Sequence, residues 1–291
     1  MNNKIKLTGS MAVALLATIL QTAQAQTHIT GWGSETGQQN GSPVSTDDGL
    51  GDFSLTGANL TGNDAPRALF STLTLVNVGD SIALSGSLTF TAGIDNNQQF
   101  RFGLFNNNGN ATGTLSGGLW SGASTGSWLG YAIAPGEITG GGSATTRVIG
   151  RSSGSSFELS GSGSGNYDVG GVQYANDPVN ASITAGTYAF GLTITKESTG
   201  VQLYYNFQQT AGGTFQDTGT VLDTSGASST EMSYDAAGFL LNGNVGSGTT
   251  PFTFNNVDVT LTPAAAPEPA TLSMIGLGFG GLLVMMRRRK N

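Results

Sequence analysis

Alternation of apolar and polar residues is the sequence feature that most constrains the fold of this chain. From residue 188 to 195, the even positions hold Tyr, Phe, Leu and Ile, and the odd positions hold Ala, Gly and Thr. From 201 to 208, the odd positions hold Val, Leu, Tyr and Phe, and the even positions hold Gln, Tyr and Asn. A period of two places successive side chains on opposite faces of a strand. Both segments are therefore predicted to be β-strands with one buried face.

The same pattern predicts further strands. They are expected at residues 99–104, 68–76 and 81–91. In the last expected strand, apolar residues occupy even positions up to Phe254 and odd positions from Val257 onward. A slip of this kind between two segments of one strand is typical of a β-bulge. No segment between the two ends of the chain has a helical apolar period of useful length, so the body is predicted to be all-β.

Composition narrows the possible classes of function. The 291 residues include 46 glycines, one histidine (His28) and no cysteine, and the formal net charge is −7. A disulfide framework, a Cys/His zinc site and a cysteine nucleophile are excluded, and a Ser-His-Asp triad would depend on His28 alone. The high glycine content argues against long helices. Because acids outnumber cations, the chain repels a phosphate backbone, and no nucleic-acid partner is expected.

Many short strands separated by Gly, Asn, Asp and Ser turns predict a sandwich or barrel. The Phe-Arg-Phe-Gly-Leu-Phe run at 100–105, the aromatic segment at 128–131 and a closing Phe-x-Asn-x-Asp-Val strand resemble a concanavalin-A-like, laminin-G-like jelly roll. The resemblance implies a jelly-roll type β-sandwich of antiparallel strands for the body, residues 26–262. The Gly/Ser-rich stretch at 136–171 is expected to be a long insertion or a pair of thin edge strands.

The first 25 residues contain the parts of a secretory signal peptide in order. Lys4 and Lys6 precede an apolar run from Met11 to Leu20, and Ala23 and Ala25 form a small-x-small cleavage site. The apolar run is too short for a stable membrane anchor. Residues 1–25 are therefore predicted to be a signal helix that is removed during export. A buried N-terminal helix is the alternative interpretation.

The opposite end also has three parts in order. A Pro/Ala linker at 263–269 contains Pro267, Glu268 and Pro269, and an apolar segment of 17 residues follows at 270–286. The basic tail, residues 287–291, holds four cations: Arg287, Arg288, Arg289 and Lys290. Seventeen residues lie at the lower limit for a transmembrane helix. The positive-inside rule keeps the basic tail in the cytoplasm, as a membrane stop.

Together these three parts resemble the PEP-CTERM sorting signal. The resemblance implies a Gram-negative bacterium that makes exopolysaccharide, and a partner of the exosortase type, a membrane-embedded cysteine transpeptidase that acts at Pro267-Glu268-Pro269. It also implies a precursor anchored in the inner membrane, with its body in the periplasm before transfer to the cell surface or extracellular matrix. An ordinary C-terminal anchor that is never cut is the alternative.

Aromatic residues are the first candidates for ligand binding in the body. Trp120, Trp128 and Tyr131 are predicted to stack on sugar rings, since each combines an apolar face with a polar edge. Trp120 and Trp128 lie on either side of a Gly/Ser turn, where a loop platform is expected. The alternative is that these side chains belong to the core or to strands.

Acidic residues suggest a weaker candidate site. Asp47, Asp48 and Asp52 form the densest acidic turn, and calcium takes carboxylate and carbonyl oxygens as ligands. Their spacing matches neither an EF-hand nor a nonapeptide calcium repeat, and aspartate is also an ordinary turn residue. No other cofactor is expected. Residues 26–266 carry a net charge of −12, which disfavours anionic polysaccharides unless a cation bridges them.

Catalysis requires groups that this sequence does not bring together. Sandwich glycosidases place two carboxylates on one strand face, about 5–10 Å apart, which reads as Glu-x-Asp along a strand. Four glutamates have no carboxylate two residues away: Glu137, Glu158, Glu197 and Glu231. The chain is therefore not expected to be an enzyme.

The sequence predicts an exported structural or adhesive protein of the cell envelope or exopolysaccharide matrix. A carbohydrate-binding, lectin-like module is the alternative, and a polysaccharide hydrolase or lyase is the third interpretation. Glycan binding that depends on Trp120 or Trp128 distinguishes the second from the first, and turnover that depends on one carboxylate distinguishes the third.

Overall fold

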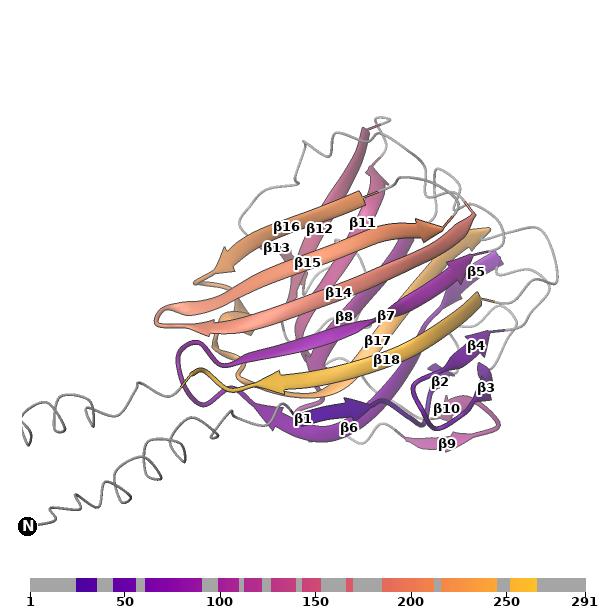
Figure 1. Cartoon of the computed structure of the whole chain (residues 1–291), viewed down its shortest axis with the longest axis horizontal. Coiled ribbons are helices and arrows are strands. Elements are labelled where there is room, and N and C mark those ends of the chain that lie inside the picture. Colours follow the sequence, from indigo (N-terminus) through magenta and orange to yellow (C-terminus); the bar gives the residue numbers. More distant parts are fainter. Residues whose placement is uncertain are drawn as a thin grey trace, which may run out of the picture. The chain divides into compact units, whose positions relative to one another are not determined.

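Two β-sheets packed face to face form the body of the protein, which confirms the predicted all-β sandwich (Figure 1). The body is one compact unit, Ala23–Thr262, separate from the unit that contains both chain ends. The computed structural model describes these residues: 25–35, 44–55, 61–90, 99–109, 113–121, 127–139, 143–152, 166–169, 185–211, 216–244 and 252–265. The predicted signal helix, apart from Ala25, and the predicted C-terminal helix lie outside these ranges. No helix within them is long and apolar enough to cross a membrane.

The first sheet has eight strands in the order β16-β15-β14-β7-β18-β4-β3, and β1 pairs with β18 beside this path. All of its pairings are antiparallel. Its strands are β1 (Ala25–His28), β3 (Val44–Asp47), β4 (Phe53–Leu55), β7 (Ser81–Phe90), β14 (Gly186–Glu197), β15 (Gly200–Ala211), β16 (Gln216–Asp223) and β18 (Phe252–Thr262).

The second sheet has ten strands in the order β13-β12-β11-β8-β17-β6-β2-β10-β9, and β5 pairs with β17. Its one parallel pairing among the described strands joins β10 to β2. Its strands are β2 (Gly33–Glu35), β5 (Thr61–Asp64), β6 (Pro66–Thr74), β8 (Gln99–Asn106), β9 (Thr114–Ser116), β10 (Leu119–Ser121), β11 (Leu129–Thr139), β12 (Ser143–Arg151), β13 (Asn166–Asp168) and β17 (Ser233–Asn244). A short 3-10 helix, η2 (Ala227–Thr230), precedes β17.

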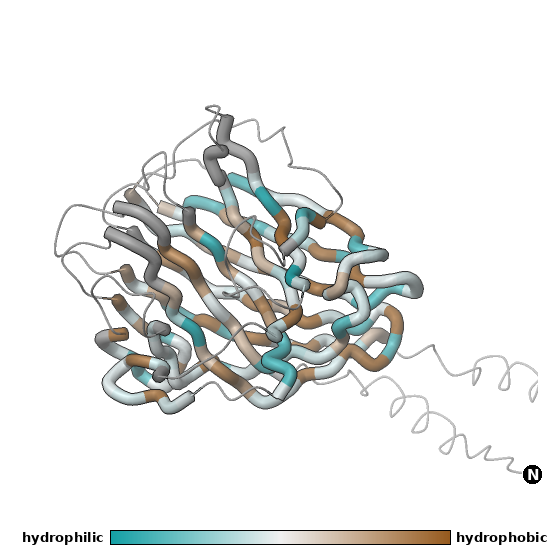
Figure 2. Tube along the Cα trace, turned by 180° about the vertical axis from the view of Figure 1, so that it is seen from behind, coloured by the Kyte–Doolittle hydropathy of each residue, from teal (hydrophilic) through white to brown (hydrophobic). Residues whose placement is uncertain are grey.

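The main core lies between the two sheets and is rich in aromatic rings. Trp32 stacks on Phe53 with ring centroids 4.2 Å apart, and Phe53 stacks on Phe254 at 4.3 Å. Phe239 of the second sheet lies 4.5 Å from Phe254, so the rings connect the two layers. All four side chains are buried. The alternation visible along the strands in Figure 2 places apolar residues in this core.

Part of the second sheet is buried on both of its faces. A separate apolar cluster lies on the face turned away from the main core, and Phe105, Trp128, Ala132 and Ile149 belong to it. Neighbouring residues of β11 therefore point into different cores, Ile133 into the main one and Ala132 into the second. Strands buried on both faces read as continuous apolar runs instead of alternating ones.

The strands predicted from alternation are present with small changes of boundary. The β-bulge is confirmed as well, because the register between β18 and β7 shifts between Asn255 and Asp258. Within the Gly/Ser-rich stretch at 136–171, β12 lies second from the sheet edge and β13 forms the edge. Residues 153–165 of that stretch lie outside the described part of the chain.

Candidate functional site

The predicted sorting segment follows directly on the last strand of the body. β18 ends at Thr262, and Pro263 to Ala265 continue without regular structure. The predicted processing residues Pro267, Glu268 and Pro269 lie outside the described residues. The predicted basic tail lies outside them too: Arg287, Arg288, Arg289 and Lys290.

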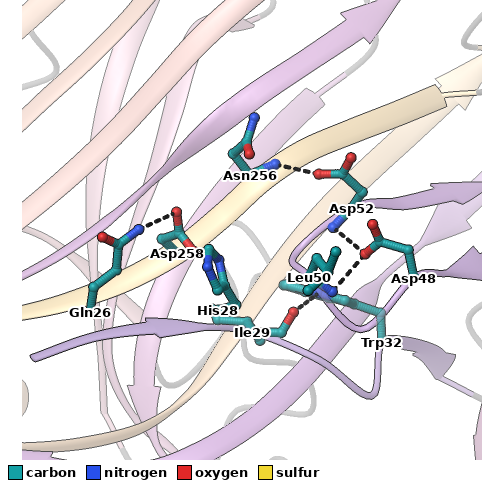
Figure 3. Close-up of polar contacts among 9 residues, drawn as sticks. All are labelled: Gln26, His28, Ile29, Trp32, Asp48, Leu50, Asp52, Asn256 and Asp258. Carbon is teal, nitrogen blue, oxygen red and sulfur yellow. Dashed lines mark hydrogen bonds and ion pairs between the residues drawn. The ribbon is translucent and has the colours of Figure 1, made fainter.

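The first strand of the body begins at the predicted signal cleavage site. Ala25, the residue after which cleavage is expected, pairs with Leu261 of β18. Ala23 lies outside the described residues. Side chains fasten β1 to β18, because Nε2 of Gln26 donates to Asp258 Oδ2 at 2.9 Å and Nδ1 of His28 lies 2.5 Å from Asp258 Oδ1 (Figure 3). The single histidine thus helps to hold β1 against β18.

Two of the three predicted sugar-binding aromatics belong to the interior. Trp128 and Tyr131 have no exposed surface, so neither offers a ring face to a sugar, and the prediction is corrected for both. Trp128 lies in the second core, where the Arg67 guanidinium carbon is 5.4 Å from its ring centroid. Trp120 of β10 is half-buried, and its indole N–H donates to the Arg67 carbonyl at 3.0 Å.

The acidic turn between β3 and β4 uses its carboxylates to hold backbone. Asp47 Oδ2 accepts hydrogen bonds from the N–H groups of Gly31 and Trp32, at 2.6 and 2.9 Å. Asp48 Oδ1 accepts from Leu50 and Asp52, and Asp52 Oδ1 accepts from Asn256 at 2.7 Å (Figure 3). Among the described residues, no group of three His, Cys, Asp or Glu side chains is placed to hold a metal ion. The three aspartates act as turn residues here.

A buried carboxylate joins the two sheets at the end of β16. Asp223 Oδ2 accepts the phenolic O–H of Tyr131 at 2.8 Å and that of Tyr167 at 2.7 Å. Its Oδ1 accepts the N–H groups of Ser225 and Gly226 at 3.3 and 3.0 Å. Asp223 belongs to the first sheet, whereas both tyrosines belong to the second. Four donors therefore satisfy one buried carboxylate across the sandwich.

The tyrosines around Asp223 are held in their neutral form. Burial, followed by the neighbouring phenols and Asp223, raises the pKa of Tyr131 far above its usual value. Burial and the hydrogen bond to Asp223 raise the pKa of Tyr167, and burial raises that of Tyr234. Neutral phenols donate hydrogen bonds and do not abstract protons, so this cluster serves to connect strands.

All four arginines of the body lie on the outer face of the second sheet, where alternation places them with the second core. They are Arg67, Arg101, Arg147 and Arg151, and each is buried. Arg147 pairs with Asp168 at 2.6 Å, and Nε of Arg151 donates to the Trp128 carbonyl at 2.9 Å. Sequence analysis did not foresee this grouping, because the four residues come from three strands that meet only through long-range pairing.

The outer face of the first sheet is open to solvent. We use the name open face for the outward residues of β7, β14, β15 and β16, which alternate with core residues and are exposed or half-buried. These residues are Ser81, Ala83, Ser85, Ser87, Thr89, Thr187, Ala189, Gly191, Thr193, Thr195, Gln202, Tyr204, Asn206, Gln208, Thr210, Gln216, Thr218, Thr220 and Leu222. None of these is an acid or a base, and Glu197, which ends the outward row of β14, is the one acid of the open face. The sequence shows the alternation within each strand. It does not show which residues of neighbouring strands lie side by side.

Comparison with solved structures gives similar folds of low sequence identity. A lectin UEA-II complexed with galactose matches with a TM-score of 0.44 at 14% identity, covering 83% of this chain and 98% of that chain. Peanut lectin with a nonapeptide matches at 0.41 and 12%, covering 84% and 99%. A legume lectin-like domain from Entamoeba histolytica matches at 0.39 and 11%, covering 80% and 90%.

Comparison with sequence families identifies the C-terminal segment. No curated protein matches the chain. The family described as the PEP-CTERM protein-sorting motif matches residues 265–290, which include the Pro-Glu-Pro trio, the apolar segment and the basic cluster. This agrees with the resemblance found in the sequence. The chain therefore carries a PEP-CTERM protein-sorting motif, placed directly after the β-sandwich.

Proposed function

We propose that this chain is an exported structural or adhesive protein of the cell envelope or exopolysaccharide matrix, delivered by an exosortase-type enzyme. The observation that carries the proposal is the PEP-CTERM motif at 265–290, just beyond the last strand. The precursor is held in the inner membrane through residues 270–286. Processing at Pro267 to Pro269 then releases the body toward the cell surface or the extracellular matrix.

The boundary of the body supports this order of events. The compact unit ends at Thr262, and every described strand lies before that residue. β18 pairs with β7 on one side and with β1 and β4 on the other. Cleavage beyond Pro267 therefore leaves every described strand and its pairings intact, and we expect the body to stay folded after processing.

The use of polar groups in the body supports a structural role over an enzymatic one. Asp223 is saturated by four donors within the protein, and the carboxylates of the β3–β4 turn accept backbone N–H groups. Glu231 accepts the N–H of Ser233 at 2.9 Å. Carboxylates engaged in this way hold turns and strands together.

Carbohydrate binding through the loop aromatics is a second candidate function. Of the three residues predicted for it, Trp120 keeps part of its surface exposed. Its ring packs on Gly33, where an added Cβ would lie 2.9 Å from Trp120 Cδ1. A Trp120→Ala variant that loses binding to a soluble glycan would support this function for the β10 region.

Sorting is tested with Glu268→Ala in cells that contain the exosortase. We expect the variant to accumulate as an uncut precursor in the inner membrane, whereas the parent chain is processed. Pro263→Ala is the matched control, because it also alters the linker but leaves the Pro-Glu-Pro trio unchanged. Normal processing of Glu268→Ala, or equal loss of processing in both variants, contradicts the proposal.

A further inference from the structure

We propose that the open face of β7, β14, β15 and β16 binds an extended, uncharged polysaccharide. These strands lie at the front in Figure 1. This proposal goes beyond delivery to the envelope, and it uses a surface separate from the predicted loop aromatics. Three properties of the face carry it, namely its single acid and lack of basic side chains, its ordered hydroxyl and amide groups, and its exposed aromatic ring.

The charge distribution selects an uncharged partner. Apart from Glu197 at the end of β14, the open face has no acidic or basic side chain, and residues 26–266 have a net charge of −12. The body's arginines are buried in the other sheet. Lys196, at the end of β14, donates its ammonium to the Val76 carbonyl at 2.7 Å. A polyanion would therefore meet no cation on this face and a negative protein around it.

Hydroxyl and amide side chains stand in rows across the strands. Thr193 of β14 pairs with Tyr204 of β15, which pairs with Thr220 of β16. The next row contains Gly191, Asn206 and Thr218. Strands are about 4.8 Å apart, and a strand of twelve residues is about 40 Å long. Ser, Thr, Asn and Gln both donate and accept hydrogen bonds, as sugar hydroxyls do, and they are easier to desolvate than charges.

Tyr204 provides an aromatic ring near the centre of the open face. Its side chain is 47% exposed, and it is the one aromatic of the exposed class among the residues whose burial the structure describes. Leu222, also 47% exposed, lies diagonally across the β15–β16 pair, within reach of an aromatic side chain. The three other large exposed apolar residues are in turns: Leu50, Val76 and Val78. A ring with an apolar face and a polar hydroxyl suits stacking on a sugar ring.

A second copy of the chain fits this face less well than a polysaccharide does. The buried centre of a stable homodimer interface is mostly apolar. On the open face, Tyr204 and Leu222 are the two large apolar side chains, and the remaining positions are small or polar. Burying so many hydroxyl and amide groups against a rigid copy of the same face would leave several of them without hydrogen bonds, at a cost in free energy.

The experiment measures retention of the full chain, purified in detergent, on insoluble uncharged polysaccharides, with cellulose, chitin and starch as probes and alginate beads as the anionic comparison. We expect retention on at least one uncharged probe and none on alginate. Tyr204→Ala should weaken binding about three- to tenfold, whereas Tyr204→Phe keeps the ring and should bind as the parent does. Thr218→Lys, which places a charge on the face, should also weaken binding.

Matched controls separate the face from general effects. Val76→Ala removes an exposed apolar side chain in a turn, and Thr30→Lys adds a lysine at an exposed threonine outside the sheet. Both should bind as the parent does. Absence of retention on every uncharged probe overturns the proposal, as does unchanged binding by Tyr204→Ala and Thr218→Lys. Concentration-dependent dimerisation that Tyr204→Ala abolishes assigns the face to a second copy instead. None of these outcomes depends on exosortase processing, so they are independent of the sorting test.

Discussion

Asp223 shows how this protein satisfies a buried carboxylate with hydrogen bonds from its own chain. Two phenols and two backbone N–H groups converge on its carboxylate, and they come from both sheets and from the turn after β16. Hydrogen bonds to a charged acceptor are stronger than those between neutral groups. A second polar contact between the sheets, from the Thr146 hydroxyl to Asp217, lies along the same strand. Single residues thus fasten β16, the edge of the first sheet, to the second sheet.

Asp223→Asn should lower the free energy of unfolding by about 1–3 kcal/mol, because an amide nitrogen replaces one acceptor oxygen and leaves a buried donor unsatisfied. Asp48→Asn is the matched control, since Asp48 is exposed and its Oδ1 acceptor is kept in asparagine. We expect a change of less than about 0.5 kcal/mol there. Thermal and denaturant unfolding of the two variants provide the comparison. Equal stability of both variants would contradict the role given to Asp223.

Stability should fall in alkaline solution through the buried tyrosines. The pKa values of Tyr131, Tyr167 and Tyr234 are raised in the folded protein. Below pH 10, each phenol is neutral in both states and has no effect on the pH dependence. Above about pH 10, the unfolded chain ionises while the fully buried Tyr131 and Tyr234 do not, so each of these two lowers stability by about 1.4 kcal/mol per pH unit. Tyr167 is half-buried and contributes less, because solvent screens its phenol.

Tyr131→Phe should reduce that alkaline slope by the share of one tyrosine. The measurement is the unfolding free energy between pH 8 and 12, with phenolate absorbance as an independent record of ionisation. Tyr204→Phe serves as the control, because Tyr204 is exposed on the first sheet. A slope that Tyr131→Phe leaves unchanged would show that Tyr131 ionises equally easily in both states.

At the scale of the element, the bulge in β18 keeps apolar residues facing the core on both sides of the register shift. Phe254 and Val257 both face the core although they are three residues apart, since the register shifts between Asn255 and Asp258. Asn256 takes a φ of 51° at the bulge, and its N–H donates to Asp52. Beyond the bulge, the outward Asp258 reaches Gln26 and His28 of β1. The bulge therefore turns the end of β18 toward the first strand.

Asn256→Ile should destabilise the body by about 1–2 kcal/mol, because a β-branched residue disfavours a left-handed φ. Asn256→Gly, the matched control, accepts that φ without strain and should unfold within about 0.5 kcal/mol of the parent. Denaturant unfolding measures both. If the isoleucine variant is as stable as the glycine variant, the backbone at the bulge differs from the one described.

Much of the fold could be predicted from local patterns. Alternation predicted β7, β14 and β15, and the parity slip predicted the bulge in β18. Alternation does not predict β12, because Val148 points into the main core and Ile149 into the second core. Apolar residues therefore follow one another along this strand. The order of strands in each sheet, and the parallel pairing of β10 with β2, depend on contacts far apart in the sequence that no local pattern specifies.

The candidate sites were less predictable than the fold. The prediction that Trp128 and Tyr131 bind sugar rests on residue type. Residue type alone does not distinguish an aromatic ring that binds sugar from one that fills a core. Alternation in the sequence places Tyr204 on the polar face of its strand. Its position beside Thr193 and Thr220 follows only from the register of three strands. The grouping of the arginines likewise required the order of strands in the second sheet.

At the scale of the whole molecule, the described strands all lie in the sequence between the predicted signal peptide, apart from Ala25, and the sorting motif. β1 begins at Ala25 and pairs with the end of β18, so the body starts and finishes on adjacent strands. The PEP-CTERM motif follows at 265–290. Removal of the predicted signal and sorting segments therefore takes only Ala25 from the described strands and leaves the other pairings of β1 with β18 in place. This arrangement fits a protein that is folded outside the inner membrane and then released from it.

The most direct test is the intact mass of the protein recovered from the cell surface or matrix, together with sequencing of both of its ends. The account predicts a chain that begins at Gln26 and lacks residues 270–291, with its new end within Pro267 to Pro269. A surface protein that retains the apolar segment and the Arg287 to Lys290 cluster would contradict it. That result would identify the C-terminal segment as a permanent membrane anchor.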